Sequence, residues 1–258
     1  MSTSFAAMPG RFAPLRDGTW TEVTLGKSSA TVWRIDAGGE TLFLKSAPAH
    51  PLSEIPGEAA RLRWLATVPV RSPLLRDYFQ QDEHDWLLMT ALPGCNLSQF
   101  TGHPDALVVA LADALRAVHS LDTATCPFDQ SLDVKLSKGA ANAAAGLVDE
   151  DDFDTAHVGW TAAAVLEVLR SDRPTTEDLV VCHGDASLPN IMADDAGFVG
   201  IIDCGRLGVA DRWQDLAIAC RSIRFNCGEA YIAPFLLAYG ASWDEQRFRY
   251  YNTLDELF

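Results

Sequence analysis

Short apolar runs near the start of the chain predict a β-hairpin. Residues 31–35 (TVWRI) and 41–45 (TLFLK) are rich in β-branched and aromatic side chains. Gly38 and Gly39 lie between these runs and suit a tight hairpin turn. A further strand-like run, WLLM, occupies residues 86–89. We therefore expect a small β-sheet in the first third of the chain.

Apolar positions at helical spacing predict helices in most of the remaining sequence. Leu62 and Leu65 fall on one face of a helix that starts near Glu58. Apolar residues recur with the same period through residues 104–121 and again through residues 161–170. The C-terminal end also favours helices. A β-rich first part followed by a helix-rich second part predicts the α+β class.

The dipeptide Pro93-Gly94 predicts a boundary between two lobes, because Pro and Gly interrupt regular elements. The charge balance changes at the same point. Residues 1–92 contain 9 basic and 10 acidic residues, whereas residues 93–258 contain 11 basic and 25 acidic residues. At about 150 residues per domain, a chain of 258 residues accommodates such a division. We expect one lobe over 1–92 and another over 93–258.

Composition and charge exclude several classes of protein. A chain that is 48% hydrophobic can bury a large core, so disorder is excluded. The net charge of −15 repels nucleic acids and anionic membranes and attracts cations. The six cysteines form no CxxC pair, which favours reduced thiols. With no apolar run of signal-peptide or membrane-spanning length, we expect a soluble, cytoplasmic protein without an obligatory protein partner.

The most informative residues follow the order of a kinase catalytic loop. His183-Gly184-Asp185 is followed by Asn190, five residues after Asp185, and then by Asp203-Cys204-Gly205. Protein kinases have His-Arg-Asp, an Asn at the same distance and then Asp-Phe-Gly. His-Gly-Asp alone would favour a tight turn in which Asp185 accepts hydrogen bonds from backbone amides. The ordered combination favours catalysis.

Phosphoryl transfer requires these residue types. Mg²⁺ prefers oxygen ligands, which suits the amide of Asn190 and the carboxylate of Asp203. A separate carboxylate must orient the attacking hydroxyl and accept its proton, and Asp185 suits that task. We read His183 as a hydrogen-bonded loop residue, in preference to a metal ligand or a base, and His119 as structural.

A kinase also needs a lysine for the nucleotide phosphates and a glutamate to hold it. Lys45 ends the second predicted strand, and Glu58 begins the following helix, with Glu54 as the competing partner. The chain contains neither a Walker A motif nor GxGxxG. The small residues around Ser28 form either a phosphate-covering turn or a plain turn.

The segments 181–190 and 202–212 together resemble the aminoglycoside 3'-phosphotransferases, also called kanamycin kinases. The ending Leu254-Asp255-Glu256-Leu257-Phe258 is similar to the acidic and aromatic C-terminus of that family. The resemblance extends from about Trp20 to Phe258. It implies a bilobal protein-kinase-like fold, and transfer of the ATP γ-phosphate to an aminoglycoside 3'-hydroxyl with Mg²⁺, which confers antibiotic resistance.

The resemblance also assigns residues. Asp185 becomes the base, Asn190 and Asp203 the metal ligands, and Lys45 with Glu58 the phosphate-holding pair. Residues 89–92 resemble the adenine hinge, in which Thr90 and Leu92 would offer backbone hydrogen bonds. The residues expected to bind the cationic substrate are Asp152, Asp154, Asp255, Glu256 and Phe258, the last through its α-carboxylate. Arg206 resembles a family arginine that lies near these acids, where it would either orient them or form a structural salt bridge.

Two departures from the family pattern put the substrate range in question. Residues 221–225 are RSIRF where an acid is usual, and Thr155 also replaces an expected acid. The alternatives are a kinase for a macrolide, choline or homoserine, and a pseudokinase acting as a binding module. A pseudokinase usually lacks the lysine, the base or a metal ligand, and this chain has all of them.

Overall fold

The computed structural model describes residues 9–24 and 30–258, so the predicted contact of Ser28 lies outside the described residues. The chain divides into two compact units. The first comprises Met1–Thr67 with Ser72–Leu92, and the second comprises Val68–Arg71 with Pro93–Phe258. One division therefore falls at Pro93-Gly94. The short return of residues 68–71 to the second unit is not indicated by the sequence.

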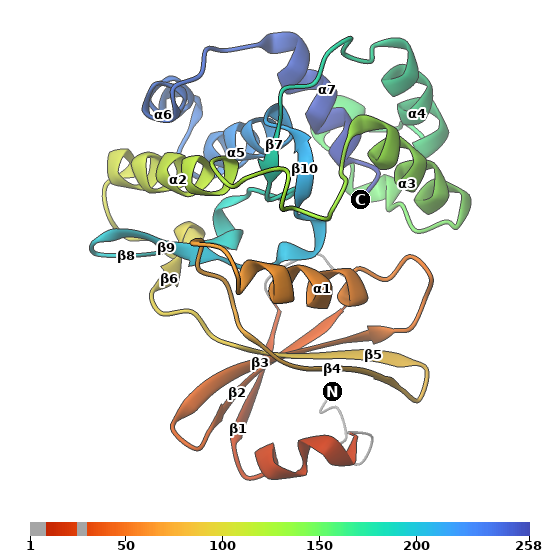
Figure 1. Ribbon diagram of the computed structural model, residues 1–258. Coiled ribbons are helices and arrows are strands. Elements are labelled where there is room, and N and C mark those ends of the chain that lie inside the picture. Colours follow the sequence, from red (N-terminus) through yellow and green to blue (C-terminus); the bar gives the residue numbers. More distant parts are fainter. Residues whose placement is uncertain (1–8, 25–29) are drawn as a thin grey trace. The chain divides into compact units, whose positions relative to one another are not determined.

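In its described residues, the first unit is a five-stranded antiparallel sheet with one α-helix (Figure 1). The order of the strands is β1-β2-β3-β5-β4. Its elements are the 3₁₀ segment η2 (Gly10–Leu15), β1 (Thr19–Val23), β2 (Thr31–Ala37), β3 (Glu40–Pro48), α1 (Ile55–Leu65), β4 (Leu75–Gln81) and β5 (His84–Thr90).

The predicted hairpin is confirmed as β2 and β3. Gly38 and Gly39 have φ values of 60° and 81°, which glycine adopts without strain, and Ala37 pairs with Glu40 across the turn. The sequence analysis missed β1 and β4. Neither strand contains a buried residue, and polar side chains interrupt their apolar ones, so both lack the apolar runs that reveal β2, β3 and β5.

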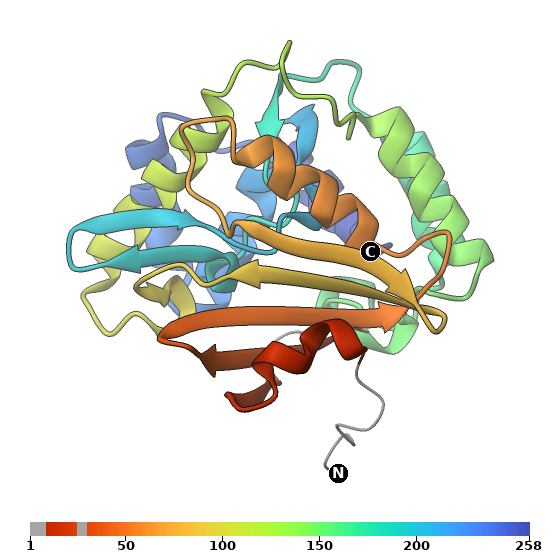
Figure 2. The ribbon, with the colours of Figure 1, turned by 60° about the horizontal axis from the view of Figure 1, so that its bottom comes forward.

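Side-chain alternation in β3 gives the sheet two different faces. Leu42 and Leu44 join Phe12 of η2 in one hydrophobic core, together with tryptophans from β2 and β5. Lys45, one position on, points to the opposite face, where α1 lies. Figure 2 shows the sheet between η2 and α1. The two-residue period of the strand thus places a lysine on the helix-covered face.

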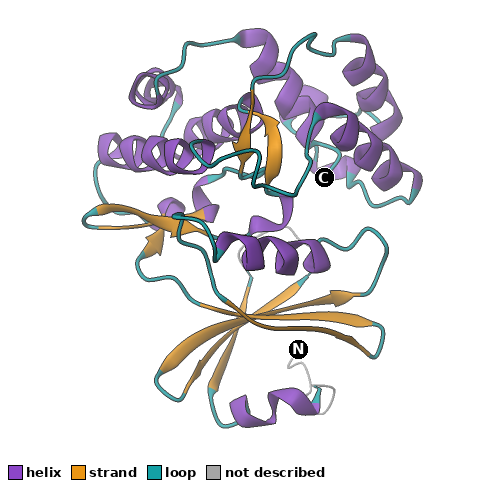
Figure 3. Ribbon diagram, in the orientation of Figure 1, coloured by secondary structure: helices purple, strands orange, loops and turns teal. Residues whose placement is uncertain are grey.

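The second unit contains most of the helices (Figure 3). Its α-helices are α2 (Pro104–His119), α3 (Leu132–Ala144), α4 (Ala162–Ser171), α5 (Trp213–Asn226), α6 (Ile232–Tyr239) and α7 (Glu245–Asp255). Its strands are β6 (Cys95–Asn96), β7 (Leu179–Cys182), β8 (Ile191–Asp194), β9 (Gly197–Ile201) and β10 (Gly208–Asp211). Its 3₁₀ segments are η3 (Leu97–Gln99), η4 (Glu150–Asp152), η5 (Thr155–His157), η6 (Leu188–Asn190), η7 (Cys204–Arg206) and η8 (Glu229–Tyr231).

Helix packing buries the apolar faces predicted from the sequence. Leu111, Leu115 and Val118 of α2 are fully buried, and α2 packs on α6 while α5 packs on α7. The antiparallel pairs β7–β10 and β8–β9 lie within this unit and end next to the predicted catalytic loop. Among the described helices, none combines the length and apolarity needed to cross a membrane.

The C-terminal end of the chain is packed against α3. Leu257 is fully buried, and its carbonyl oxygen accepts a hydrogen bond of 2.9 Å from Asn142 Nδ2. Gly139 leaves the space that the Leu257 side chain fills: a Cβ atom at Gly139 would lie 2.6 Å from Leu257 Cδ1. The last residues are therefore part of the fold.

We expect Gly139→Val to lower the free energy of unfolding by about 1–3 kcal/mol, the usual cost of overpacking a buried site. The exposed Ala144→Val on the same helix is the control. Helix propensity alone would favour the opposite order, because valine is a better helix former than glycine and a poorer one than alanine. Urea unfolding of both variants measures the difference. A smaller loss in Gly139→Val than in Ala144→Val would contradict this packing argument.

Candidate active site

The first unit contributes a buried ion pair between β3 and α1. Lys45 Nζ lies 2.9 Å from Glu58 Oε2 and 3.1 Å from Glu58 Oε1. The two side chains are only 13% and 4% exposed, so the pair is held in a fixed geometry. Glu54, the competing partner, is exposed at the N-terminus of α1. The structure thus brings together the predicted lysine and Glu58.

The predicted hinge lies at the end of β5, whose last residue is Thr90. The Thr90 amide donates to the Leu74 carbonyl at 3.0 Å, and Thr90 Oγ1 accepts from the Leu74 amide at 2.9 Å. Because this amide already has a partner, a nucleotide contact from Thr90 has to use another atom. Leu92 follows the strand and is half-buried.

In the second unit, a buried carboxylate holds the start of the catalytic loop. Asp215, on α5, accepts hydrogen bonds from the backbone amides of His183 at 2.6 Å and Gly184 at 2.8 Å. Gly184 has a φ of 86°, and a Cβ atom there would lie 2.2 Å from the Arg206 carbonyl oxygen. Only glycine fits this position.

The imidazole of His183 is part of the same support. His183 Nδ1 accepts from the Asp185 amide at 3.2 Å, and Nε2 lies 2.9 Å from the Ile202 carbonyl oxygen. Since Nδ1 accepts, the proton is on Nε2, which donates to Ile202. This residue therefore connects the loop to the segment before Asp203, in agreement with the structural role expected from the sequence.

Asp185 and Asn190 are in direct contact. Asn190 Nδ2 donates to Asp185 Oδ2 at 2.8 Å and to the Asp185 carbonyl at 3.0 Å. Because the nitrogen of this amide points to Asp185, its oxygen is the atom available to a cation. The Ile202 amide donates to the Asn190 carbonyl at 3.0 Å, which ties the loop to the residue preceding Asp203.

The electrostatic surroundings change the affinity of Asp185 for a proton. Burial raises the pKa of its carboxyl group. The charge of Arg206 opposes this shift, whereas the negative charges of Asp255 and Asp203 add to it, and the net direction is upward.

Asp203 is exposed and has a positive φ of 56°, an uncommon conformation for a residue other than glycine. Such strain concentrates at functional sites.

His119, Cys182 and Asp215 lie together beneath this loop, with ligand atoms within 4.8 Å of one another. Asp215 also accepts a hydrogen bond from His119 Nε2 at 3.0 Å, and His119 Nδ1 lies 2.7 Å from the Tyr239 hydroxyl oxygen. Burial raises the pKa of the Cys182 thiol well above its usual value, which disfavours the thiolate that binds metals. We therefore regard this cluster as structural support.

The acidic residues expected to bind substrate lie near the C-terminal end, where basic residues accompany them. Asp255 forms ion pairs with Arg206, at 3.5 Å, and with Arg221. Burial raises the pKa of Asp255, but the charges of Arg221 and Arg206 outweigh it and keep that pKa below its ordinary value. The centroid of the Phe258 ring lies 3.6 Å from Lys135 Nζ and 5.6 Å from the Arg206 guanidinium carbon.

The predicted acidic loop lies beside the same end of the chain. The Asp154 amide donates to Glu256 at 3.0 Å, and His157 Nδ1 lies 2.8 Å from Glu256 Oε1. Asp152 is exposed in η4. The structure therefore brings Asp154 together with Glu256, and Arg206 together with Asp255.

Comparisons with known proteins agree with this geometry. A model of the phosphotransferase enzyme family matches residues 19–251. The aminoglycoside 3'-phosphotransferase of Streptomyces fradiae is 38% identical over 254 residues, which cover 93% of this chain and 95% of that protein. The chain belongs to the phosphotransferase enzyme family, among the aminoglycoside phosphotransferases.

Solved structures of aminoglycoside phosphotransferases have the same fold. An aminoglycoside 3'-phosphotransferase of type VIII superposes with a TM-score of 0.88 at 36% identity, covering 98% of this chain and 97% of that chain. A relative from Streptomyces rimosus, in complex with ADP and streptomycin, gives a TM-score of 0.81 at 28% identity, covering 96% and 95%. The predicted family and α+β fold are confirmed.

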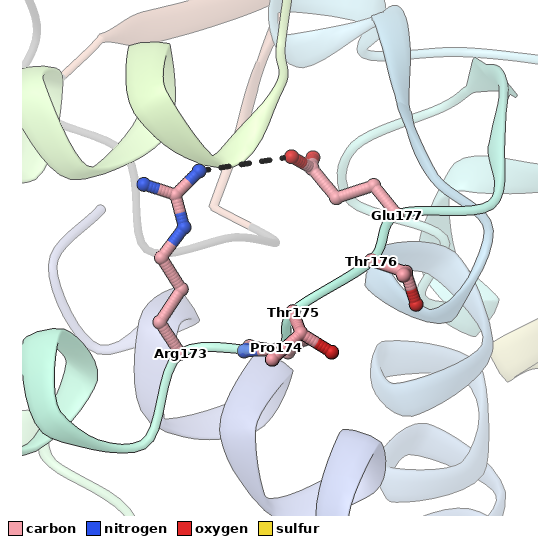
Figure 4. Close-up of a pocket in the computed structure, with 5 residues that line it drawn as sticks. All are labelled: Arg173, Pro174, Thr175, Thr176 and Glu177. Carbon is pink, nitrogen blue, oxygen red and sulfur yellow. Dashed lines mark ion pairs between the residues drawn. The ribbon is translucent and has the colours of Figure 1, made fainter.

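This phosphotransferase also has a pocket away from the predicted residues (Figure 4). Its volume is about 410 Å³, and it is lined by Arg173, Pro174, Thr175, Thr176 and Glu177. Arg173 lies 3.8 Å from Glu177 across the pocket and 2.6 Å from Asp133. None of the predicted site residues in the described ranges lines it, so we do not include it in the candidate active site.

Sequence reasoning missed several residues of this site. Arg221 appeared only as a departure from the family pattern, and Lys135, Asn142 and His157 were not singled out. Each is a basic or amide side chain that contacts the C-terminal end from a distant part of the sequence. A pattern of residues along the chain gives no signal for such contacts.

We expect Asp215→Asn to lower the free energy of unfolding by about 3–5 kcal/mol at pH 7, the usual loss when a buried charged pair is broken. Burial raises the pKa of Asp215, but His119 and the amide hydrogen bonds outweigh it and lower that pKa overall. A carboxyl group with a lowered folded pKa stabilises the fold above its unfolded pKa of about 3.9, and this stabilisation is lost as the pH falls through the folded value.

The variant and the wild type should therefore converge in stability under acid conditions. Urea unfolding at pH 7, 5 and 2.5 measures the difference, with the exposed Asp195→Asn as the control. A difference that is the same at all three pH values would show that the Asp215 charge does not stabilise the loop.

Proposed function

We propose that this phosphotransferase transfers the γ-phosphate of ATP to the 3'-hydroxyl of aminoglycoside antibiotics. The observation that carries the proposal is the arrangement around the Asp185 loop: Asp185 contacts Asn190, and Arg206, whose carbonyl oxygen lies against Gly184, pairs with Asp255 of the acidic C-terminal end. Arg206 and Asp255 both influence the Asp185 carboxyl group. A candidate base next to a set of carboxylates suits a substrate that carries several ammonium groups.

In this proposal Asp185 is the catalytic base. The substrate hydroxyl oxygen forms a bond to the γ-phosphorus, the bond between that phosphorus and the β,γ-bridging oxygen breaks, and ADP leaves with that oxygen. The hydroxyl proton passes to Asp185. Its raised pKa brings the carboxylate closer to the basicity that proton acceptance requires.

The nucleotide and its metal ion are assigned to other residues. Lys45, held by Glu58, would contact the ATP phosphates, and Thr90 with Leu92 would lie at the adenine. The amide oxygen of Asn190 and the carboxylate of Asp203 are the hard oxygen donors that Mg²⁺ prefers, so both fit this ion. When bound, Mg²⁺ neutralises phosphate charge. The relative that binds ADP supports the use of ATP.

Carboxylates of the second unit would bind the aminoglycoside. Asp152, Asp154, Glu256 and the α-carboxylate of Phe258 would contact ammonium groups, while Arg206 orients Asp255. The proposal includes a cytoplasmic location, which agrees with the six free cysteines. Expression in a sensitive bacterium should then confer resistance.

A second candidate is phosphorylation of streptomycin, because one relative of known structure holds streptomycin with ADP. That relative is 28% identical to this chain, whereas the 3'-phosphotransferase of Streptomyces fradiae is 38% identical. The greater identity favours the 3'-hydroxyl.

The proposed function is tested by measuring ADP release with kanamycin, streptomycin, a macrolide and choline, and by locating the phosphate in the product by NMR. We expect turnover with kanamycin and phosphate on its 3'-oxygen. An aminoglycoside without a 3'-hydroxyl should inhibit competitively without being phosphorylated, because Asp185 then has no proton to accept. Phosphate at another position, or preference for streptomycin, choline or a macrolide, would refute the assignment.

Asp185→Asn should lower kcat for kanamycin by about 10²–10⁴, the range for losing a positioned base, while the KM for ATP changes little. In the wild type, kcat/KM should fall as the pH drops through the raised pKa of Asp185, so the acid limb should lie above the ordinary aspartate value of about 3.9. Steady-state kinetics across pH measure both effects. Near-normal turnover of the variant would remove Asp185 from the role of base.

A further inference from the structure

His157 joins the acidic loop to the C-terminal end of the chain. It ends η5, directly after the acidic segment, and its Nδ1 atom lies 2.8 Å from Glu256 Oε1. The Asp154 amide donates to the same carboxylate, at 3.0 Å to Oε1 and 3.3 Å to Oε2. One glutamate therefore receives two donors from a loop about a hundred residues earlier in the chain.

The imidazole is fixed at both of its nitrogens. An ionised carboxylate only accepts hydrogen bonds, so Nδ1 carries the proton that Glu256 receives. His157 Nε2 lies 3.1 Å from Thr253 Oγ1, on the last turns of α7, and Thr253 Oγ1 also lies 2.9 Å from the Arg249 carbonyl. The Trp160 ring packs edge-on against the imidazole with centroids 5.0 Å apart. These contacts leave one orientation for the ring.

Several charged groups surround this contact. Arg221, on α5, interacts electrostatically with both Asp154 and Glu256, and it pairs with Asp255 on α7. His157 and Glu256 are 12% and 7% exposed, so neither side chain is free to change rotamer at little cost. The carboxylates of Asp154 and Glu256 carry like charges, which repel one another when their segments are in contact. Asp154 and Glu256 therefore need a donor between their segments to remain adjacent.

We propose that His157 is a positioning residue for aminoglycoside binding, which holds Glu256 and the acidic loop as one preassembled array of carboxylates. This inference rests on the proposed function. A polycation gains most from carboxylates whose relative positions are already fixed, because binding then does not have to order them. Since the Asp185 loop is held separately by Asp215, loss of His157 should affect binding of the aminoglycoside and leave the chemical step intact.

The test compares three variants at this position. His157→Ala removes both contacts. His157→Asn keeps a donor near the position of Nδ1, toward Glu256, whereas His157→Gln places its amide near the position of Nε2, toward Thr253. The two amides are neutral and similar in chemistry. They differ only in which of the two contacts they can restore.

We expect His157→Ala and His157→Gln to raise the kanamycin KM about tenfold, as for loss of a hydrogen bond to a charged group. In both variants kcat and the KM for ATP should stay within about twofold of the wild type, and His157→Asn should restore the kanamycin KM. Tyr250→Phe is the control for stability: it removes a buried hydrogen bond from α7 to the Leu169 carbonyl without touching His157 or Glu256. It should lower the melting temperature and leave the kanamycin KM unchanged.

The outcomes separate this inference from the proposed function. If the wild type does not phosphorylate kanamycin, the proposed function fails, and this inference fails with it. If the wild type is active and His157→Ala has an unchanged kanamycin KM, only the inference is overturned. Equal effects of Asn and Gln, or a parallel loss of kcat and of affinity for ATP, would also overturn it, since a general structural role predicts them. Should His157→Ala fail to fold, the comparison of Asn with Gln decides.

Discussion

The buried carboxylate of Asp215 determines the geometry of the candidate catalytic loop. Two consecutive amides, those of His183 and Gly184, donate to its two oxygens, and His119 donates to it from α2. This arrangement requires a positive φ at Gly184, where the Arg206 carbonyl leaves no room for a side chain. A charge that is costly to bury is thus stabilised by donors from the loop itself. Asp185 is the next residue along the chain, so its position depends on these hydrogen bonds.

The second constraint is the concentration of charge at the C-terminal end. Asp255 and Glu256 are adjacent acids, and each has its own basic or neutral donor from another element: Arg206 and Arg221 for Asp255, and His157 for Glu256. The fold therefore provides each of these carboxylates with its own donors before any ligand binds. Packing of Leu257 against Gly139 fixes the backbone that carries them.

Local patterns in the sequence were sufficient to predict the elements and residues that obey short-range rules. The hairpin of β2 and β3, the helix α2 and the spacing from Asp185 to Asn190 all depend on neighbours along the chain. The lysine on β3 and the glutamate on α1 were predictable because a kinase needs such a pair, and the sequence places one residue at a strand end and the other at the start of the next helix. In contrast, β1 and β4 are the edge strands of the sheet and contain no buried residue, so their own residues carry little signal.

Long-range contacts explain the remaining differences. The sequence analysis treated Arg221 as a missing acid, but its guanidinium pairs with Asp255 and reduces the negative charge available there. A substrate ammonium group that approaches Asp255 must therefore compete with an arginine already in place. Glu256 is held by other donors, the His157 imidazole and the Asp154 backbone amide, while Arg221 acts on it from nearby. Within this acidic end, the type of donor that holds each acid, more than the number of acids, determines how strongly it attracts a cation.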